Sequence, residues 1–322
     1  MGCSGIPDDL RALYCAHGQA QVFRFADRGL LRPPEVASLV SQLRSIDPCR
    51  VNDIFAQAMH GGGAAHDLTG NGGDHDTATI IEPAEGTVAL AAADPADVTA
   101  WRKIGLEAVA AGKVAAVVLG GGQGTRLGFD GPKGMYDIGL PSGRSLFQLQ
   151  AERLRRLRDL AQAEVAEVPE STEASKTAIE TAAGMPAGKV GAPPPPGKRT
   201  PPTAVPPVPY YVMTSSLNEE QTRRYFAEHD YFGLPADSVF FFPQGTLPCL
   251  AEDGQILLES AGRVAEAPDG NGGLYPALAA TGALANMKRR GVEYLHVFSV
   301  DNALVRPADP VFVGFCVAAG AP

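Results

Sequence analysis

The sequence has few cysteines, a single tryptophan and no long apolar run. Its five cysteines are scattered through 322 residues, and no two of them lie at the CxxC spacing. That pattern argues against a disulfide framework and against a zinc site. No run approaches the roughly 18 apolar residues that a membrane-spanning helix requires. We therefore expect a cytoplasmic protein with reduced cysteines and no membrane association.

Positively charged residues are fewer than negatively charged ones, with 27 Lys and Arg against 36 Asp and Glu. The formal net charge is −9 at pH 7, which argues against a surface that binds nucleic acid or an anionic membrane. A site for phosphate must then be built locally, from a few cations and backbone amides. Hydrophobic residues make up 45% of the chain, which is enough for a large core, and the length favours two structural units.

The strongest functional pattern follows an apolar run at 114–119. This run is short and β-branched, as expected of one buried parallel strand. Four glycines come directly after it, followed by an arginine and a lysine: Gly120, Gly121, Gly122, Gly124, Arg126 and Lys133. Glycine permits a turn whose N–H groups face phosphate oxygens, and the two cations add positive charge beside it. The pattern predicts a phosphate-binding loop.

Two common nucleotide-binding motifs do not fit this loop. No Lys-Ser or Lys-Thr pair closes it, as a Walker loop would require. Leu127 occupies the position of the third glycine of a dinucleotide-binding fingerprint, and Pro132 disfavours an immediate long helix. The loop must therefore bind phosphate in some other way.

Downstream of the loop, strand and helix patterns alternate. Strands are expected at 210–213, 239–242 and 294–300. Such alternation predicts an α/β fold with a mostly parallel sheet, whose ligands bind beyond the carboxyl ends of the strands. The glycine loop, Thr214 and Asp301 would then lie at the same edge of the sheet.

Several local features of the helices are predicted as well. One helix is expected at 94–112 and another at 274–290, and Asp253-Gly254 is expected to form a hairpin turn. Ser216 and Glu219 are expected to form a capping box. A helix beginning at Ser145 would carry a solvated outer face made of Arg153, Arg155, Arg156 and Arg158.

Two segments lack a pattern that could form a core. Residues 60–78 are rich in glycine and contain three histidines: His60, His66 and His75. Their spacing matches no zinc or calcium pattern, so we expect an exposed flexible loop. Residues 162–208 are rich in Ala, Glu, Thr, Gly and Pro and are expected to form a disordered insertion. A docking site for a proline-binding partner is the alternative for this second segment.

Four blocks carry a family resemblance: LGGGQGTRLG with PKGMYD at 119–137, FFPQGTLP at 241–248, APDGNGG at 267–273 and SVDN at 299–302. Together they resemble the eukaryotic UDP-N-acetylhexosamine pyrophosphorylases. The resemblance implies an α/β fold with a Rossmann-like, mostly parallel sheet of the nucleotide-diphospho-sugar transferase (GT-A-like) type. It also implies an N-terminal helical region at 1–100 and a nucleotidyltransferase domain at 101–322. Members of this family continue further, so we expect later strands and a C-terminal domain to be missing.

The implied reaction joins UTP and N-acetylglucosamine 1-phosphate to give UDP-N-acetylglucosamine and pyrophosphate. By the same resemblance, UTP is held by Leu119, Gly120, Gly121 and Gly122. Arg126 and Lys133 would grip the phosphates and stabilise charge during transfer. Most members of the family carry alanine where this sequence has Gly120.

The later blocks imply further site residues. Gln244 would read the uracil edge, although Pro243 and Thr246 beside it depart from the family pattern. Gly270 would approach uracil, and Asn271 would approach the sugar phosphate. Asp301, expected at the end of a buried strand, would be the Mg²⁺ ligand, because Mg²⁺ keeps most of its waters and needs only one or two protein oxygens.

The sequence leaves several alternatives open. The sugar substrate could be glucose 1-phosphate or another hexose 1-phosphate. The chain could instead be a paralogue that binds uridine nucleotides without catalysis, and without the family's later segments we expect poor turnover. Neither the preference between N-acetylglucosamine and N-acetylgalactosamine nor the oligomeric state follows from the sequence.

Overall fold

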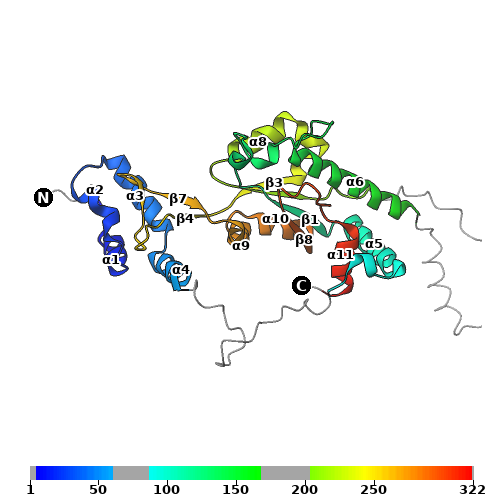
Figure 1. Ribbon diagram of the computed structural model, residues 1–322, viewed down its shortest axis with the longest axis horizontal. Coiled ribbons are helices and arrows are strands. Elements are labelled where there is room, and N and C mark those ends of the chain that lie inside the picture. The colour runs from blue at the N-terminus through cyan, green and yellow to red at the C-terminus, as the bar shows by residue number, and fades with distance from the viewer. Residues whose placement is uncertain (1–4, 61–86, 168–203, 321–322) are drawn as a thin grey trace, which may run out of the picture. The chain divides into compact units, whose positions relative to one another are not determined.

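The computed structural model describes residues 5–60, 87–167 and 204–320 (Figure 1). The chain forms two compact units. Unit 1 contains Met1–Thr87 and Gly245–Gly273, and unit 2 contains Val88–Gln244 and Leu274–Pro322. In the described part of the chain, no helix has the length and hydropathy needed to cross a membrane.

Unit 2 is built on a parallel sheet of four strands in the order β3-β2-β1-β8. The strands are β1 (Val114–Leu119), β2 (Tyr210–Thr214), β3 (Val239–Pro243) and β8 (Tyr294–Ser299). The central pair is in register, with Val118 opposite Val212. β-branched and aromatic side chains favour this extended, buried backbone. The α/β fold with a mostly parallel sheet is therefore confirmed.

Helices cover both faces of this sheet (Figure 1). Alternate strand residues point to opposite faces, so Val118 joins one core cluster and Val117 the other. The first cluster is completed by α5 (Pro95–Ala110), α6 (Leu146–Glu167), α8 (Glu219–Glu228) and α11 (Pro310–Ala318). The second is completed by α9 (Leu274–Ala280) and α10 (Ala283–Arg290). The sheet is thus the middle layer of three.

Helices α5 and α11 pack backbone against backbone. A Cβ atom added at Gly314 would lie 1.7 Å from the carbonyl oxygen of Trp101, and one added at Gly105 would lie 1.9 Å from that of Pro310. These distances are far shorter than any real contact. The two glycines therefore fix how closely the helices approach each other.

In its described residues, unit 1 combines four α-helices with short antiparallel strands. The helices are α1 (Asp8–Ala16), α2 (Arg24–Asp27), α3 (Pro33–Ser45) and α4 (Pro48–His60). The strands are β4 (Thr246–Pro248), which pairs with β7 (Glu266–Pro268), and β5 (Leu258–Ser260), which pairs with β6 (Arg263–Val264). Their shared core includes Tyr14, Leu39, Leu43, Ile256 and Val264.

Residues 245–273 were predicted to belong to the second domain, whereas the structure groups them with the N-terminal helices. Two buried or half-buried glutamines account for this grouping. Gln19 donates to the carbonyl oxygen of Gly254 and accepts from the N–H of Ile256. Gln42 likewise donates to and accepts from the backbone of Val264. Such long-range side-chain contacts leave no periodic pattern in the sequence.

Two helix predictions are corrected by the structure. The helix predicted at 274–290 is two helices, because Gly282 adopts a left-handed φ of 77° between them. The capping box of Ser216 and Glu219 is wrong, since Asn218 occupies the N-cap position of α8. Helix α5 begins after Asp94, as predicted, and the Asp94 side chain caps this helix by accepting from the N–H of Ala96.

The predicted insertion at 162–208 is wrong at both of its ends. Helix α6 continues to Glu167. Val205 and Val208 are buried in the core of unit 2, and the N–H of Val205 donates to Oε1 of Gln162 at 2.7 Å. The remainder of that prediction, at 168–203, lies outside the described residues, as does the predicted loop beyond His60.

The arginine face of α6 is not simply solvated, which corrects another prediction. Arg153 Nη1 donates to the carbonyl oxygens of Ala303 and Val305 at 2.7 Å each. Arg155 Nη1 donates to the carbonyl oxygen of Phe232 at 3.3 Å. Two of the four arginines therefore hold neighbouring loops in place.

Candidate functional site

The glycine loop leaves the carboxyl end of β1, the strand between β2 and β8. The N–H of Gly120 donates to the carbonyl oxygen of Met213 on β2 at 2.9 Å. A Cβ atom at Gly120 would lie 2.9 Å from that same oxygen and 3.5 Å from the ring of Phe147. Glycine thus lets the loop backbone stay close to β2 as the strand ends.

Asn218, which the sequence analysis missed, fixes the shape of this loop. Its side chain is fully buried. The amide nitrogen donates to the carbonyl oxygen of Gly120 at 3.0 Å, and to that of Gly122 at 3.4 Å. The amide oxygen accepts from the N–H of Ser215 at 2.8 Å. An asparagine directly before a helix that follows a buried strand is the signal that could have identified it.

The loop then folds back and returns Lys133 to the glycines. The N–H of Gly124 donates to the carbonyl oxygen of Gly131 at 2.8 Å, and the N–H of Lys133 donates to that of Gly122 at 3.1 Å. The Lys133 side chain lies over Gly122, since a Cβ atom there would be 3.5 Å from Cδ and 3.9 Å from Nζ. These are ordinary van der Waals distances, so the side chain packs directly over this glycine.

Lys133 also meets Asp301, as the prediction of a shared sheet edge required. Lys133 Nζ lies 3.3 Å from Asp301 Oδ2, with side-chain exposures of 28% and 56%. Gln150, which is buried, donates to the carbonyl oxygen of Val300 at 3.0 Å and so holds the residue before Asp301. The expectation that Asp301 ends a buried strand is wrong, because β8 is an edge strand of this sheet and Asp301 is exposed.

Gln244 reaches the glycine loop from β3. Its N–H donates to the carbonyl oxygen of Thr214 at 2.8 Å. Its carboxamide packs against Gly121, where a Cβ atom would lie 2.8 Å from Nε2. The structure therefore brings Gln244, Lys133 and Asp301 to the loop formed by Gly120, Gly121 and Gly122. The roles predicted for these residues stay predictions.

Three other predicted residues are not joined to this group by any described contact. Arg126 lies in a short 3₁₀-helix, η3 (Thr125–Leu127), is exposed, and has no hydrogen bond or ion pair with any described residue. Gly270 and Asn271 belong to unit 1, where Gly270 has a φ of 76° and Asn271 opens η7 (Asn271–Gly273). Their predicted contacts with the nucleotide stay predictions.

Asp269 organises the glycine-rich turn of unit 1 and was also missed. Its N–H donates to the carbonyl oxygen of Gly245 at 3.0 Å. A Cβ atom would lie 1.8 Å from Asp269 Oδ1 if added at Gly273, and 2.6 Å from Oδ2 if added at Gly245. Oδ1 is buried without a hydrogen-bond partner among the described residues. The carboxylate thus explains why two glycines flank this turn.

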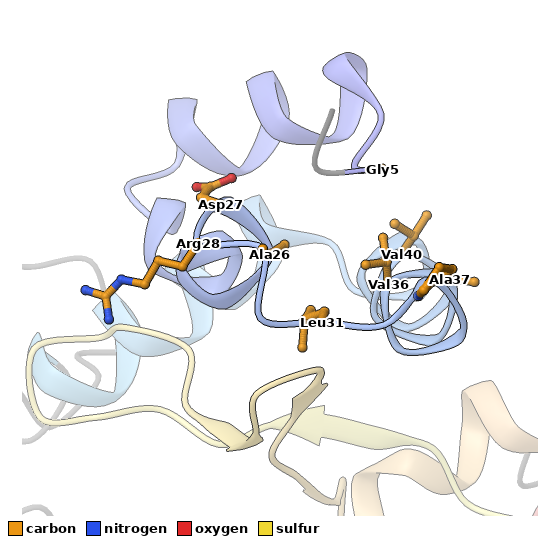
Figure 2. A pocket seen from close by; sticks show the side chains of 10 residues that line it. Gly5, Ala26, Asp27, Arg28, Leu31, Val36, Ala37 and Val40 are labelled. Atoms are coloured by element: carbon orange, nitrogen blue, oxygen red, sulfur yellow. The ribbon is translucent and has the colours of Figure 1, made fainter. Parts of the chain in front are cut away.

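A cavity of about 600 Å³ in unit 1 is a different kind of site (Figure 2). Figure 2 shows aliphatic side chains in its lining, which include Ala26, Leu31, Val36 and Val40, beside the charged Asp27 and Arg28. Asp27 at its rim is already ion-paired with Arg11 at 2.6 Å. None of the predicted site residues lines this cavity, so it does not compete with the glycine loop as the candidate site.

Among the described residues, no group of three or more His, Cys, Asp or Glu side chains could hold a metal ion. Asp301 is a carboxylate that contacts a cation of the loop, Lys133. A single exposed carboxylate suits Mg²⁺, which takes few protein ligands and fills its other positions with water and substrate phosphates. The donor set is therefore compatible with Mg²⁺ delivered together with a nucleotide.

Comparison with known proteins gives consistent matches. A sequence model of the family described as UTP–glucose-1-phosphate uridylyltransferase matches residues 92–176 and 203–322. The chain is similar to UDP-N-acetylhexosamine pyrophosphorylase-like protein 1 of Xenopus tropicalis, with 38% identity over 94% of this chain and 51% of that protein. It is similar to UDP-N-acetylglucosamine diphosphorylase 2 of Arabidopsis thaliana, with 36% identity over 94% of this chain and 51% of that protein.

A solved structure agrees with these sequence matches. The uridine diphosphate N-acetylglucosamine pyrophosphorylase of Trypanosoma brucei, determined in complex with an inhibitor, has a TM-score of 0.68 and 26% identity to this chain. The match covers 100% of this chain and 56% of that chain. The chain thus spans about half the length of the proteins that it matches.

Proposed function

Because the chain belongs to the UTP–glucose-1-phosphate uridylyltransferase family, we propose that it transfers a uridylyl group from UTP to N-acetylglucosamine 1-phosphate. The products are UDP-N-acetylglucosamine and pyrophosphate. The observation that carries this proposal is the contact of Lys133 with both Gly122 and Asp301 at the carboxyl edge of a parallel sheet. This edge is where α/β proteins bind nucleotides.

In this reaction the protein has to position the substrates and neutralise their negative charge, and it does not have to transfer a proton. A phosphate oxygen of the sugar phosphate attacks the α-phosphorus of UTP in line, the bond to the β-phosphate bridging oxygen breaks, and pyrophosphate leaves. The nucleophile and the leaving group are both anionic, so no general acid or base is required. Lys133, and Arg126 on the same loop, are proposed to neutralise the phosphates while backbone amides of the loop orient them.

The base and the phosphates have separate partners in this proposal. Leu119 and the three glycines at 120–122 hold the nucleotide through their backbone. Gln244, packed on Gly121, offers an amide oxygen and an amide nitrogen that match the acceptor and donor edge of uracil. Asn218 shapes the loop without having to touch the nucleotide.

Asp301 is the proposed protein ligand of Mg²⁺. When bound, the ion would offset charge on the UTP phosphates. Asp301 also pairs with Lys133, which keeps both side chains at the loop. We further propose that the reaction takes place in the cytoplasm, a proposal that rests on the scattered cysteines of the sequence.

The sugar is the least constrained part of the proposal. N-acetylglucosamine 1-phosphate is preferred because the two relatives reported above bear names that refer to UDP-N-acetylhexosamine or UDP-N-acetylglucosamine. Glucose 1-phosphate is the second candidate, since the matching family is described by that sugar phosphate. A uridine-nucleotide-binding chain without turnover is the third, because the residues that the structure brings to the glycine loop, Lys133, Gln244 and Asp301, are those assigned to UTP and Mg²⁺.

Calorimetric titration with UTP and Mg²⁺, together with a pyrophosphate-release assay, tests the proposal. We expect Lys133→Ala and Gln244→Ala to weaken UTP binding by about tenfold or more, because each removes a polar partner of the nucleotide. Lys113→Ala is the matched control, since Lys113 pairs with Glu293 beside the start of β1. Equal UTP affinity in Lys133→Ala and Lys113→Ala would contradict the proposed site. UTP binding with no release of pyrophosphate from either sugar phosphate would favour the third candidate.

A further inference from the structure

A second cavity, of about 510 Å³, lies in unit 2 between α5, α6 and the segment that leads into α11. Its lining contains four arginines: Arg102, Arg153, Arg156 and Arg306. None of the residues assigned above to UTP or Mg²⁺ is among its lining residues. Four guanidinium groups around one cavity are unexpected in a chain with a net charge of −9.

Carboxylates neutralise only part of this charge. Arg306 lies 3.7 Å from Asp309, and Arg102 lies 3.8 Å from Glu164. Arg153 donates instead to two backbone carbonyl oxygens. Arg156 has no hydrogen bond or ion pair with any residue that the structure describes. Two positive charges at the cavity are therefore not matched by a carboxylate.

Apart from Asp309, the ion-pair partner of Arg306, the rest of the lining is apolar. Leu157 is buried and Leu160 half-buried on α6, and Pro307 and Pro310 contribute from the opposite segment. A cavity of this volume is in the range of small-molecule sites, which combine an apolar lining with a few polar groups. The lining thus suits a ligand with both an anionic end and a non-polar part.

We propose that this cavity binds a small organic phosphate. A phosphate monoester carries between one and two negative charges near neutral pH, which corresponds to the unmatched charge of Arg153 and Arg156. Guanidinium groups bind two phosphate oxygens at once. The non-polar part of the ligand lies on Leu157 and Leu160. The ligand is distinct from the UTP held by the glycine loop.

Occupancy of the cavity also affects the Mg²⁺ ligand, a consequence that rests on the proposed function. Arg153 holds the carbonyl oxygens of Ala303 and Val305, directly after Asp301. Arg306 follows in the same segment. A phosphate that draws Arg153 or Arg306 toward the cavity shifts this segment, and with it Asp301. Binding at the cavity therefore changes the affinity for UTP, and UTP changes the affinity for the phosphate by the same factor.

The fluorescence of Trp101, the one tryptophan of the chain, provides a local readout, because Trp101 precedes Arg102 on α5. The probe is phenyl phosphate, titrated into the full chain, with benzyl alcohol as the uncharged control. We expect a saturable change with phenyl phosphate and none with benzyl alcohol. The variant R156A/R306A should bind about tenfold more weakly or worse. R158A is the matched control, because Arg158 is on the same helix but outside the cavity lining and pairs with Asp159.

The binding proposal is overturned if the fluorescence of the wild-type chain shows no saturable change with phenyl phosphate. It is also overturned if R156A/R306A and R158A bind phenyl phosphate with equal affinity. Loss of phenyl phosphate binding in Lys133→Ala would locate the probe at the glycine loop and would likewise overturn it. Circular dichroism of R156A/R306A verifies that the variant is folded. Titrating UTP and Mg²⁺ with and without saturating phenyl phosphate tests the coupling, and an unchanged UTP affinity refutes it. If no UTP binds under either condition, the proposed function fails while the phosphate site is still decided by the fluorescence titration.

Discussion

Replacing Asn218 by alanine isolates the contribution of one buried side chain to the glycine loop. The substitution removes the hydrogen bonds at 2.8 Å to the N–H of Ser215 and at 3.0 Å to the carbonyl oxygen of Gly120. Both backbone groups then lose this partner where Asn218 had been fully buried. An unsatisfied buried group costs about 1–3 kcal/mol, so we expect the free energy of unfolding to fall by about 2–4 kcal/mol.

Asn218→Asp separates the two hydrogen bonds. The remaining carboxylate oxygen can still accept from the N–H of Ser215, but the other oxygen replaces a donor and faces the carbonyl oxygen of Gly120. It also adds negative charge beside a loop proposed to bind phosphates. We expect UTP binding to be weaker in Asn218→Asp than in Asn218→Ala, although the aspartate variant keeps one hydrogen bond.

Urea unfolding and calorimetric titration with UTP and Mg²⁺ measure these two effects. Glu220→Ala, an exposed position on the same helix, serves as the control and should change the free energy of unfolding by less than about 0.5 kcal/mol. The reasoning is refuted if Asn218→Ala is no less stable than Glu220→Ala. It is also refuted if Asn218→Asp binds UTP as tightly as the unsubstituted chain.

Three further predictions follow from the geometry. Gly314→Ala should lower the free energy of unfolding by about 1–3 kcal/mol or more, measured in urea, because its Cβ would meet the carbonyl oxygen of Trp101 at 1.7 Å. His296 Nδ1 accepts from the N–H of Ala308 at 2.7 Å, and burial lowers the pKa of His296 while Asp309 opposes this shift. The unfolded chain therefore binds the proton more readily, so stability should fall as the pH drops below about 6.5 and stay level above it. His296→Gln, which keeps an acceptor but does not titrate, should reduce that slope. Lys133→Ala should change the free energy of unfolding by less than about 1 kcal/mol, since the ion pair of Lys133 with Asp301 is partly exposed. The same variant should bind UTP more weakly. Comparable losses of stability and of UTP binding energy would contradict the role of Lys133 at the site.

The sheet and the loop could be predicted because their signals are local. The run at 114–119 is buried on both faces, so an unbroken apolar stretch marks it as a parallel strand. The glycines after it and Asp301 follow strand ends, and parallel strands bring their carboxyl ends to one edge. The contact between Lys133 and Asp301, 168 residues apart, also depends on the loop, whose backbone hydrogen bonds return Lys133 to that edge.

Predictions from the sequence were wrong for features that depend on residues far away along the chain. Residues 245–273 contact the N-terminal helices through Gln19 and Gln42, and nothing in the local sequence around either glutamine indicates these contacts. Val205 and Val208 lie in a proline-rich stretch, yet unit 2 buries them. Asp301 was expected to follow a buried strand, but β8 lies at an edge of the sheet. Burial of this kind is set by what packs against a residue, which local composition does not contain.

The sequence by itself determined the parallel α/β sheet, the glycine loop and the residue types at its edge, because strand period, glycine density and charge act over a few positions. Only the tertiary structure decided which side chains hold that loop in shape, such as Asn218, and which arginines of α6 face a cavity or a backbone carbonyl. A helix face looks equally polar whether it meets solvent or a neighbouring segment. The neighbour becomes known only when the chain is folded.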